Sequence, residues 1–208
     1  MRHAFARGSG RAAPSRAAAI LASAAIVATL AAACGPGPAT PSAREVPIGP
    51  TPWPSGTTGQ YGLHIDPGLL GLLPRNVAAH PLVEDADNEM AALTDPNLAK
   101  TFDNSAAASI GFIGDANWLQ LVVGHLRPDQ QDADVYTSWV AEYATGACSQ
   151  ADGVSSTNQT TINDWVVDVS TCAGGPIVYT LSLGNGTILS MFGLGPKDLG
   201  RMLIGALY

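Results

Sequence analysis

Basic residues are scarce in this chain, and their scarcity excludes one large class of partner. The 208 residues include 10 Lys and Arg against 17 Asp and Glu. Four of the ten basic residues lie within the first 16 positions, so without residues 1–33 the formal charge falls from −7 to −11. Nucleic acids are bound through clustered cations, which the rest of the chain lacks. The sequence therefore predicts no nucleic-acid partner, and it also disfavours electrostatic attachment to anionic lipid.

Catalytic and metal-binding motifs are missing as well. No Gly-x-Ser-x-Gly turn occurs, so a serine hydrolase of the α/β type is not predicted. His64, His80 and His125 are far apart in the sequence, unlike the closely spaced ligands of a zinc site. The acidic stretch 84–89 has Met90 where a calcium loop needs its turn glycine, so it is interpreted as a solvated helix N-terminus. We predict no catalytic, cofactor-binding or metal-binding residue.

The first 33 residues have the pattern of an export signal. An uncharged segment from Ala17 to Leu30 follows four arginines, at Arg2, Arg7, Arg11 and Arg16. A positive region, an apolar region and small residues at the cleavage site define a signal peptide. The apolar segment is just shorter than the roughly 18 residues of a spanning helix. We predict a cleaved signal peptide over these residues, with an uncleaved anchor as the alternative.

The end of this segment resembles the lipobox of bacterial lipoproteins. The residues are Ala31-Ala32-Ala33-Cys34-Gly35, with Leu30 one position further from the cysteine than is usual. The resemblance implies that Cys34 is lipidated and that acyl chains hold the protein at the extracytoplasmic face of the cell membrane. The alternative is ordinary cleavage after Ala33, which would leave Cys34 as a free thiol.

The other two cysteines, Cys148 and Cys172, form a pair in an exported chain, where disulfides persist. Closing this loop of about 25 residues would stabilise the fold by roughly 3–4 kcal/mol. We predict a disulfide between them; two buried free thiols are the alternative.

Composition divides the remaining chain into two parts. Residues 34–60 are rich in proline, which cannot build a packed core and favours extended chain. They are interpreted as a disordered tether that follows the lipidated cysteine. Residues 61–208 have the length of one globular domain.

Local patterns within 61–208 predict both strands and helices. Asp-Pro pairs at Asp66 and Asp95 indicate helix starts, and Asn185-Gly186 indicates a tight hairpin. Strands are expected over 82–83, 118–126, 160–171, 177–183 and 187–192. Helical segments are expected over 67–73, 87–93, 95–106, 132–146 and 197–207, the last with Leu199, Met202, Leu203 and Leu207 on one face.

This order predicts an α+β fold. We expect an antiparallel sheet of about four to five strands, covered by helices on one face in a two-layer sandwich. The disulfide would join the end of a helix to the end of a strand.

Two further resemblances bear on the domain. The run that begins Trp118-Leu119 and continues to Ser170-Thr171-Cys172 is similar to secreted lipoproteins of high-GC bacteria. The order of elements resembles the Mog1/PsbP-like sandwich of some such lipoproteins. That likeness implies a role in interaction or assembly rather than catalysis.

The sequence favours a membrane-anchored extracytoplasmic lipoprotein with a non-catalytic domain that binds a small molecule, a cell-wall component or an envelope protein. The alternative is a cell-envelope hydrolase that uses a carboxylate pair, drawn from Glu84, Asp85, Asp87 and Glu142. A third alternative is a structural subunit with an exposed apolar patch and no cavity. The aromatic residues are expected in the core, or else lining a pocket for a sugar or a lipid tail; they are Trp118, Trp139, Trp165 and Tyr179.

Overall fold

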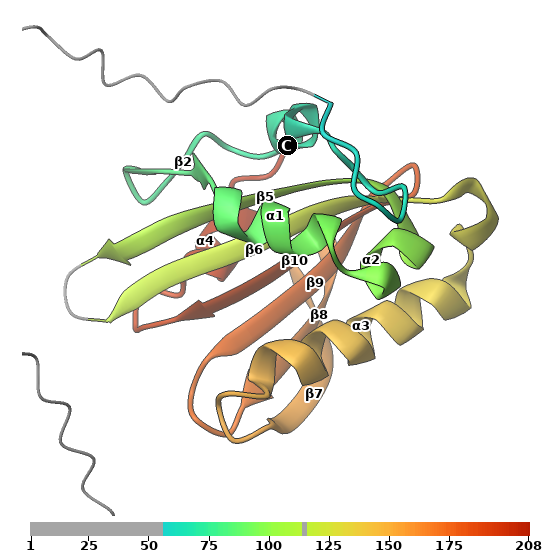
Figure 1. Ribbon diagram of the computed structural model, residues 1–208. Coiled ribbons are helices and arrows are strands. Elements are labelled where there is room, and N and C mark those ends of the chain that lie inside the picture. The colour runs from blue at the N-terminus through green and yellow to red at the C-terminus, as the bar shows by residue number, and fades with distance from the viewer. Residues whose placement is uncertain (1–55, 114–115) are drawn as a thin grey trace, which may run out of the picture. The chain divides into compact units, whose positions relative to one another are not determined.

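The computed structural model describes residues 56–113 and 116–208 (Figure 1). They belong to one compact unit, Gly49–Tyr208. The predicted signal peptide, Cys34 and most of the predicted tether lie outside the described residues. Among the described residues no helix has the length and apolar character needed to cross a membrane.

The fold is mixed, with a few helices around one large open sheet of eight strands. Seven strands follow the order β1-β5-β6-β10-β9-β8-β7, and β4 also pairs with β5. All pairs are antiparallel except β1 with β5. The strands are β1 His64–Ile65, β4 Val83–Glu84, β5 Phe102–Ile113, β6 Asn117–Leu126, β7 Val154–Ile162, β8 Trp165–Cys172, β9 Ile177–Gly184 and β10 Thr187–Leu194. The expected four to five strands were therefore too few. A separate small hairpin joins β2 Asn76–Val77 to β3 His80–Pro81.

Aspartate side chains begin most of the helical segments. Each capping carboxylate accepts a hydrogen bond from a backbone N–H of the first turn, which otherwise has no partner within the helix. The segments capped in this way are η1 Pro67–Leu72, α1 Ala86–Leu93, α2 Pro96–Thr101, α3 Ala133–Cys148 and α4 Leu199–Gly205, and their caps are Asp66, Asp85, Asp95, Asp132 and Asp198. A short segment without a side-chain cap, η2 Pro128–Gln130, precedes α3.

Two hairpins order the far half of the sheet. The predicted turn at Asn185-Gly186 is confirmed, because both residues have positive φ, 49° and 73°. The single strand expected over 160–171 is wrong, since Asn163 and Asp164 also adopt positive φ, 47° and 68°, and turn the chain between β7 and β8. Asn and Asp tolerate positive φ, but because they are also common outside turns, this pair did not by itself predict one.

The helix expected over 95–106 ends at Thr101, and Phe102 begins strand β5. The ring of Phe102 packs edge-on against Trp139 of α3, with ring centroids 4.7 Å apart. On the other side, β5 pairs along its length with β6. The small residues that follow Phe102 have no strong preference for strand, so long-range pairing decides their conformation.

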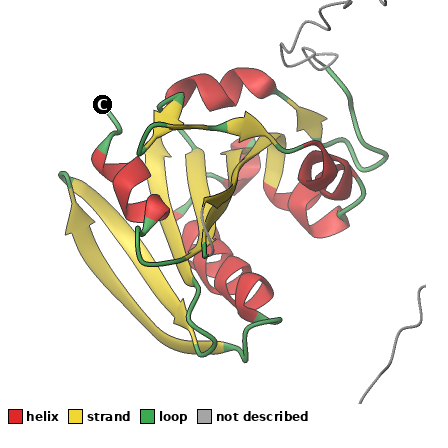
Figure 2. Ribbon diagram, turned by 90° about the vertical axis from the view of Figure 1, so that its left-hand side faces the viewer, coloured by secondary structure: helices red, strands yellow, loops and turns green. Residues whose placement is uncertain are grey.

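Helices cover both faces of the sheet, which corrects the expected two-layer arrangement. Helices α1, α2 and α3 lie on one face, and α4 lies on the opposite face (Figure 2). Alternate residues of β10 follow this division: Ile188 packs with Trp139 of α3, whereas Leu189 packs in the cluster that contains Leu199 and Leu203 of α4. The buried face of α4 includes Ile204, fully buried, rather than Met202, which is 44 % exposed.

The cysteine pair lies between α3 and the sheet. The sulfur atoms of Cys148 and Cys172 are 2.01 Å apart, as in a disulfide. Cys148 is the last residue of α3 and Cys172 is the last residue of β8. Both are buried together with Ala144 and Val178, so the bond joins the end of the helix to the end of the strand.

Candidate functional site

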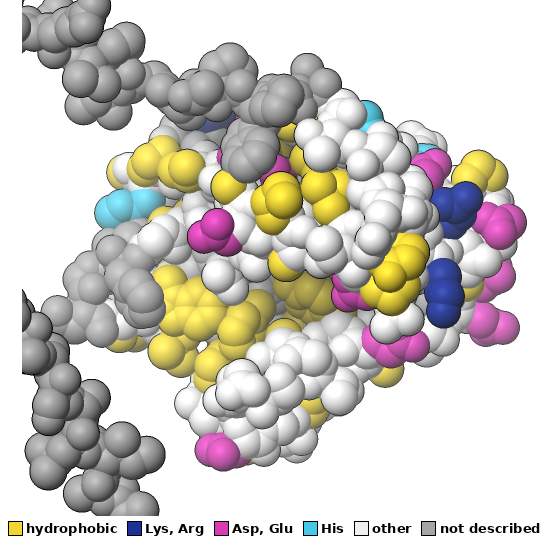
Figure 3. Space-filling model, in the orientation of Figure 1, with side chains coloured by type: hydrophobic (Ala, Val, Ile, Leu, Met, Phe, Trp, Pro, Cys, Tyr) yellow, Lys and Arg dark blue, Asp and Glu magenta, His cyan; other side chains and the backbone are white. Residues whose placement is uncertain are grey.

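An apolar groove lies on the face of the sheet that carries α1, α2 and α3. Its walls are α1 with α2 on one side and α3 on the other, and its floor is formed by β5, β6 and β10. Figure 3 shows hydrophobic side chains gathered in this hollow between the helices. The volume of the groove is about 640 Å³, which lies within the usual range for small-molecule sites.

Small side chains explain why the two helical walls do not close over the sheet. Ala91 and Ala92 line the groove from α1, and Gly146 and Ala147 line it from α3. These residues have little or no side chain beyond Cβ, so they leave the space between the helices unfilled. The same pattern continues on the floor at Ala107 of β5.

Aromatic rings form the fixed part of the lining. Trp139 donates its Nε1–H to Ser190 Oγ at 2.9 Å and contacts the ring of Tyr143, with centroids 5.5 Å apart. Phe192 packs edge-on against Trp118, with centroids 5.0 Å apart. Each of these rings therefore contacts a neighbouring ring, and Trp139 is also hydrogen-bonded to the sheet.

Glu89 of α1 is a buried carboxyl group beneath this groove. Its side chain is 1 % exposed, and Oε1 accepts a hydrogen bond from the N–H of Ala107 at 3.2 Å. The outer edge of β5 pairs with β1 up to Ser105 and with β4 from Ala108. Ala107 lies in the gap between these two short strands, and the carboxyl group of Glu89 fills that gap.

Burial raises the pKa of Glu89 above its ordinary value of 4.5. The hydrogen bond from Ala107 opposes this rise, and the negative charges of Glu84 and Asp85 add to it. The neutral acid is therefore favoured at this position more than at an exposed glutamate. In that form one oxygen can donate a hydrogen bond.

Two buried polar atoms have no hydrogen-bond partner within the described part of the chain. They are Oε2 of Glu89 and Oγ of Ser105, and both residues line the groove. Buried polar groups are nearly always paired, so an exception in a native protein needs a physical reason. The two exceptions lie in the lining of one cavity, where a bound molecule could supply the missing partner.

The lining of the groove includes three carboxylic acids and no basic residue. The acids are Glu89, Asp95 and Glu142, and no Lys, Arg or His is among the lining residues. Asp95 is occupied as the cap of α2, since its Oδ1 accepts from the N–H of Asn97 at 2.8 Å. Glu142 is exposed on α3, so the groove presents carboxylate but no positive charge.

The structure does not bring the four carboxylates proposed for a hydrolase together in the groove. Glu84 lies on β4, Asp85 caps α1 and Asp87 is exposed in the first turn of that helix. Glu142 alone of the four lines the groove. Glu89 of α1, which the sequence analysis assigned to a solvated stretch, also lines the groove.

A signal for Glu89 was present in the sequence. Ala92 and Leu93, three and four residues later, share its buried position in α1. Residues at this spacing lie on one face of a helix. A carboxylate on the apolar face of a short amphipathic helix therefore indicated a buried acid. Because its neighbours are also acidic, the whole stretch was interpreted as solvated.

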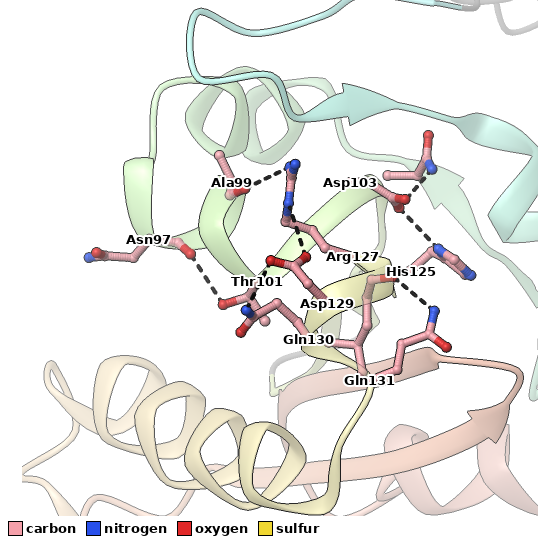
Figure 4. Close-up of polar contacts among 11 residues, drawn as sticks. Asn97, Ala99, Thr101, Asp103, His125, Arg127, Asp129, Gln130 and Gln131 are labelled. Carbon is pink, nitrogen blue, oxygen red and sulfur yellow. Dashed lines mark hydrogen bonds and ion pairs between the residues drawn. The ribbon is translucent and has the colours of Figure 1, made fainter.

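A second polar cluster lies at the ends of β5 and β6 (Figure 4). His125 and Asp103 contact each other through Nδ1 and Oδ1 at 3.0 Å, and the same oxygen accepts from Asn104 at 2.8 Å. In the described part of the chain no hydroxyl or thiol group hydrogen-bonds to His125. The contact therefore orients the imidazole but does not form a nucleophile–base pair.

The three histidines of the described residues lie on three different strands. His64 on β1 contacts Thr58 Oγ1 at 3.2 Å, His80 is on β3, and His125 is on β6. Within residues 56–113 and 116–208, no three side chains of His, Cys, Asp or Glu come together in an arrangement suited to a metal ion.

Comparison of the chain with protein-family models, curated proteins and solved structures finds no match.

Proposed function

We propose that this chain is a lipid-anchored extracytoplasmic lipoprotein whose domain binds an apolar small molecule in the groove without transforming it. The observation that carries the proposal is the hollow of about 640 Å³ between α1, α2 and α3, lined by fixed aromatic rings and small side chains. A cavity that is mostly apolar, with a few polar groups directed into it, is typical of a ligand site.

The leader and the lipobox-like residues support the location. A cleaved signal followed by Cys34 and a proline-rich tether would place the domain outside the membrane, at the end of an extended chain. Labelling cells with palmitate tests this part. The wild-type chain should incorporate label and Cys34→Ser should not; equal labelling of both, or of neither, would reject the anchor.

Binding can be tested on residues 49–208, because all of the described packing and the disulfide lie within this compact unit. The probe is N-phenyl-1-naphthylamine, an uncharged dye whose fluorescence rises in apolar surroundings. Ala91→Trp should abolish the rise, because residue 91 is exposed and lines the groove. Met90→Trp is the matched control, since residue 90 is exposed on the same helix but does not line the groove.

The expected result is dye binding by the wild type and by Met90→Trp, with a loss of at least tenfold in affinity for Ala91→Trp. Equal binding by all three proteins would show that the dye binds elsewhere. No binding by the wild type would reject the function.

A hydrolase is the second candidate, because Glu89 and Glu142 line the same groove from opposite walls. Acid–base hydrolysis needs two such carboxyl groups. Against it, Oε1 of Glu89 already accepts a hydrogen bond from the N–H of Ala107, which commits one oxygen of the acid to the backbone of β5. Turnover of an ester or glycan substrate that is lost in both Glu89→Gln and Glu142→Gln would establish the hydrolase and overturn the non-catalytic proposal.

A further inference from the structure

We infer that the groove selects an uncharged, hydroxyl-bearing amphiphile, with its hydrocarbon chain along the aromatic wall and its hydroxyl group near Glu89 and Ser105. The inference rests on the proposed ligand-binding function and adds the chemical class of the ligand. It is carried by the charges of the lining and by the two unpartnered polar atoms beneath it.

The lining argues against an anionic ligand. A carboxylate or phosphate taken out of water needs a cation or several hydrogen-bond donors in compensation. None of the lining residues is basic, and Glu142 adds negative charge at the wall. Lys100 lines a neighbouring hollow and not the groove.

At Glu89 a cationic head group gains less than a neutral one, so the attraction of the groove for a cation depends on the exposed Glu142. Glu89 would attract a cation only in its ionised form, which burial disfavours. Its contact with Ala107 uses one oxygen as an acceptor, and the other oxygen, when protonated, is a donor. A neutral hydroxyl group is the complement of such an acid, because it can accept and donate at once.

The position of Ser105 gives the ligand a second contact. Ser105 is 1 % exposed on β5, two residues before Ala107, so both side chains point to the same face of the sheet. Its Oγ is covered, so contact with a ligand requires the side chain to rotate about χ1. A hydroxyl group that enters the groove can then bond to Oγ, which has no partner among the described residues.

Amide side chains at the groove favour the same class. Asn88, Asn97 and Gln120 line it from α1, α2 and β6. Amides both donate and accept hydrogen bonds and carry no charge. They suit the remaining hydroxyl groups of a polyol head group, whereas they do not neutralise an ion.

Three probes with the same 14-carbon chain length test the inference on residues 49–208. They are monomyristoylglycerol, myristate and tetradecyltrimethylammonium, which are neutral, anionic and cationic, each used below its aggregation concentration. Displacement of bound N-phenyl-1-naphthylamine measures the affinities. Monomyristoylglycerol should displace the dye at a concentration at least tenfold lower than either charged probe.

Ser105→Ala should lower the affinity for monomyristoylglycerol threefold to tenfold and leave the affinity for the dye unchanged. Ser109→Ala is the matched control, because Ser109 lies on the same face of β5 but does not line the groove. Equal or tighter binding of a charged probe would overturn the ligand class while leaving the binding function intact. An unchanged affinity in Ser105→Ala would overturn the contact, and a dye that does not bind at all would reject the binding function itself.

Discussion

Replacing Gly124 of β6 by alanine should destabilise the domain, because the new Cβ would overlap the ring of Phe102. An ideal Cβ at this position lies 2.5 Å from Cδ1, 2.6 Å from Cε1 and 2.9 Å from Cγ of that ring. Phe102 is 1 % exposed and is held edge-on by Trp139 of α3. The ring therefore cannot move aside without disturbing the helix that forms one wall of the groove.

The expected loss follows from two opposing effects. Overpacking a buried site destabilises by about 1–3 kcal/mol. Alanine is favoured over glycine within a strand by roughly 0.5–1 kcal/mol. Because three ring atoms lie under 3.0 Å from the new Cβ, the overlap should dominate, and the net loss should be about 1–2 kcal/mol. Gly111→Ala in β5 is the control, since nothing lies within 4 Å of its Cβ, and it should be neutral or slightly stabilising.

Urea unfolding of residues 49–208, followed by circular dichroism, measures these changes in the free energy of unfolding. The double variant Gly124→Ala with Phe102→Leu should lose less stability than the sum of the two single variants, because the smaller side chain relieves the overlap. A Gly124→Ala protein as stable as the wild type would refute the packing of Phe102 on β6. It would also remove the argument that Phe102 positions α3 through Trp139.

Three further predictions concern stability. Replacing both Cys148 and Cys172 by serine should lower the free energy of unfolding by about 3–4 kcal/mol, since the bond joins residues 24 positions apart in the sequence; a reductant should lower the melting temperature of the wild type and leave that of the variant unchanged. Because the pKa of Glu89 is raised above 4.5 in the folded state, the wild type should lose stability as the pH rises from 4.5 through the folded pKa. The stability of Glu89→Gln relative to the wild type should therefore rise over that window, and a difference that is constant with pH would contradict the argument. Tyr179→Phe removes the hydroxyl group that donates to Asp198 Oδ2 at 2.8 Å and should lower the free energy of unfolding by about 1–3 kcal/mol, measured by the same urea titration.

Short motifs predicted the structure correctly where the groups that stabilise a turn or a helix end lie within the motif itself. Asp66 and Asp95, each followed by proline, predicted helical segments that begin as expected, because a carboxylate three or fewer residues away completes the first turn. Asn185-Gly186 predicted its hairpin because both residues tolerate positive φ. The pairing of Cys148 with Cys172 was predicted from the number of cysteines, since lipidation of Cys34 would leave only one possible intramolecular pair.

Sequence patterns did not predict the structure where the residues that fix a conformation are distant in the chain. Phe102 continues a helical pattern in the sequence, yet its ring is placed by Gly124 and Trp139, which lie more than 20 residues away. The spacing of Leu199 and Leu203 predicted α4 but not the face of the sheet that it covers.

The sequence by itself determined the caps, the tight hairpin and the cysteine pair, because each depends on groups that are close along the chain or have no competing partner. Only the tertiary structure decided the eight-stranded sheet, the helices on both of its faces and the groove. Glu89 belongs to this second group. Its acid is buried because two edge strands leave the N–H of Ala107 unpaired, and the burial of a carboxyl group depends on what folds around it.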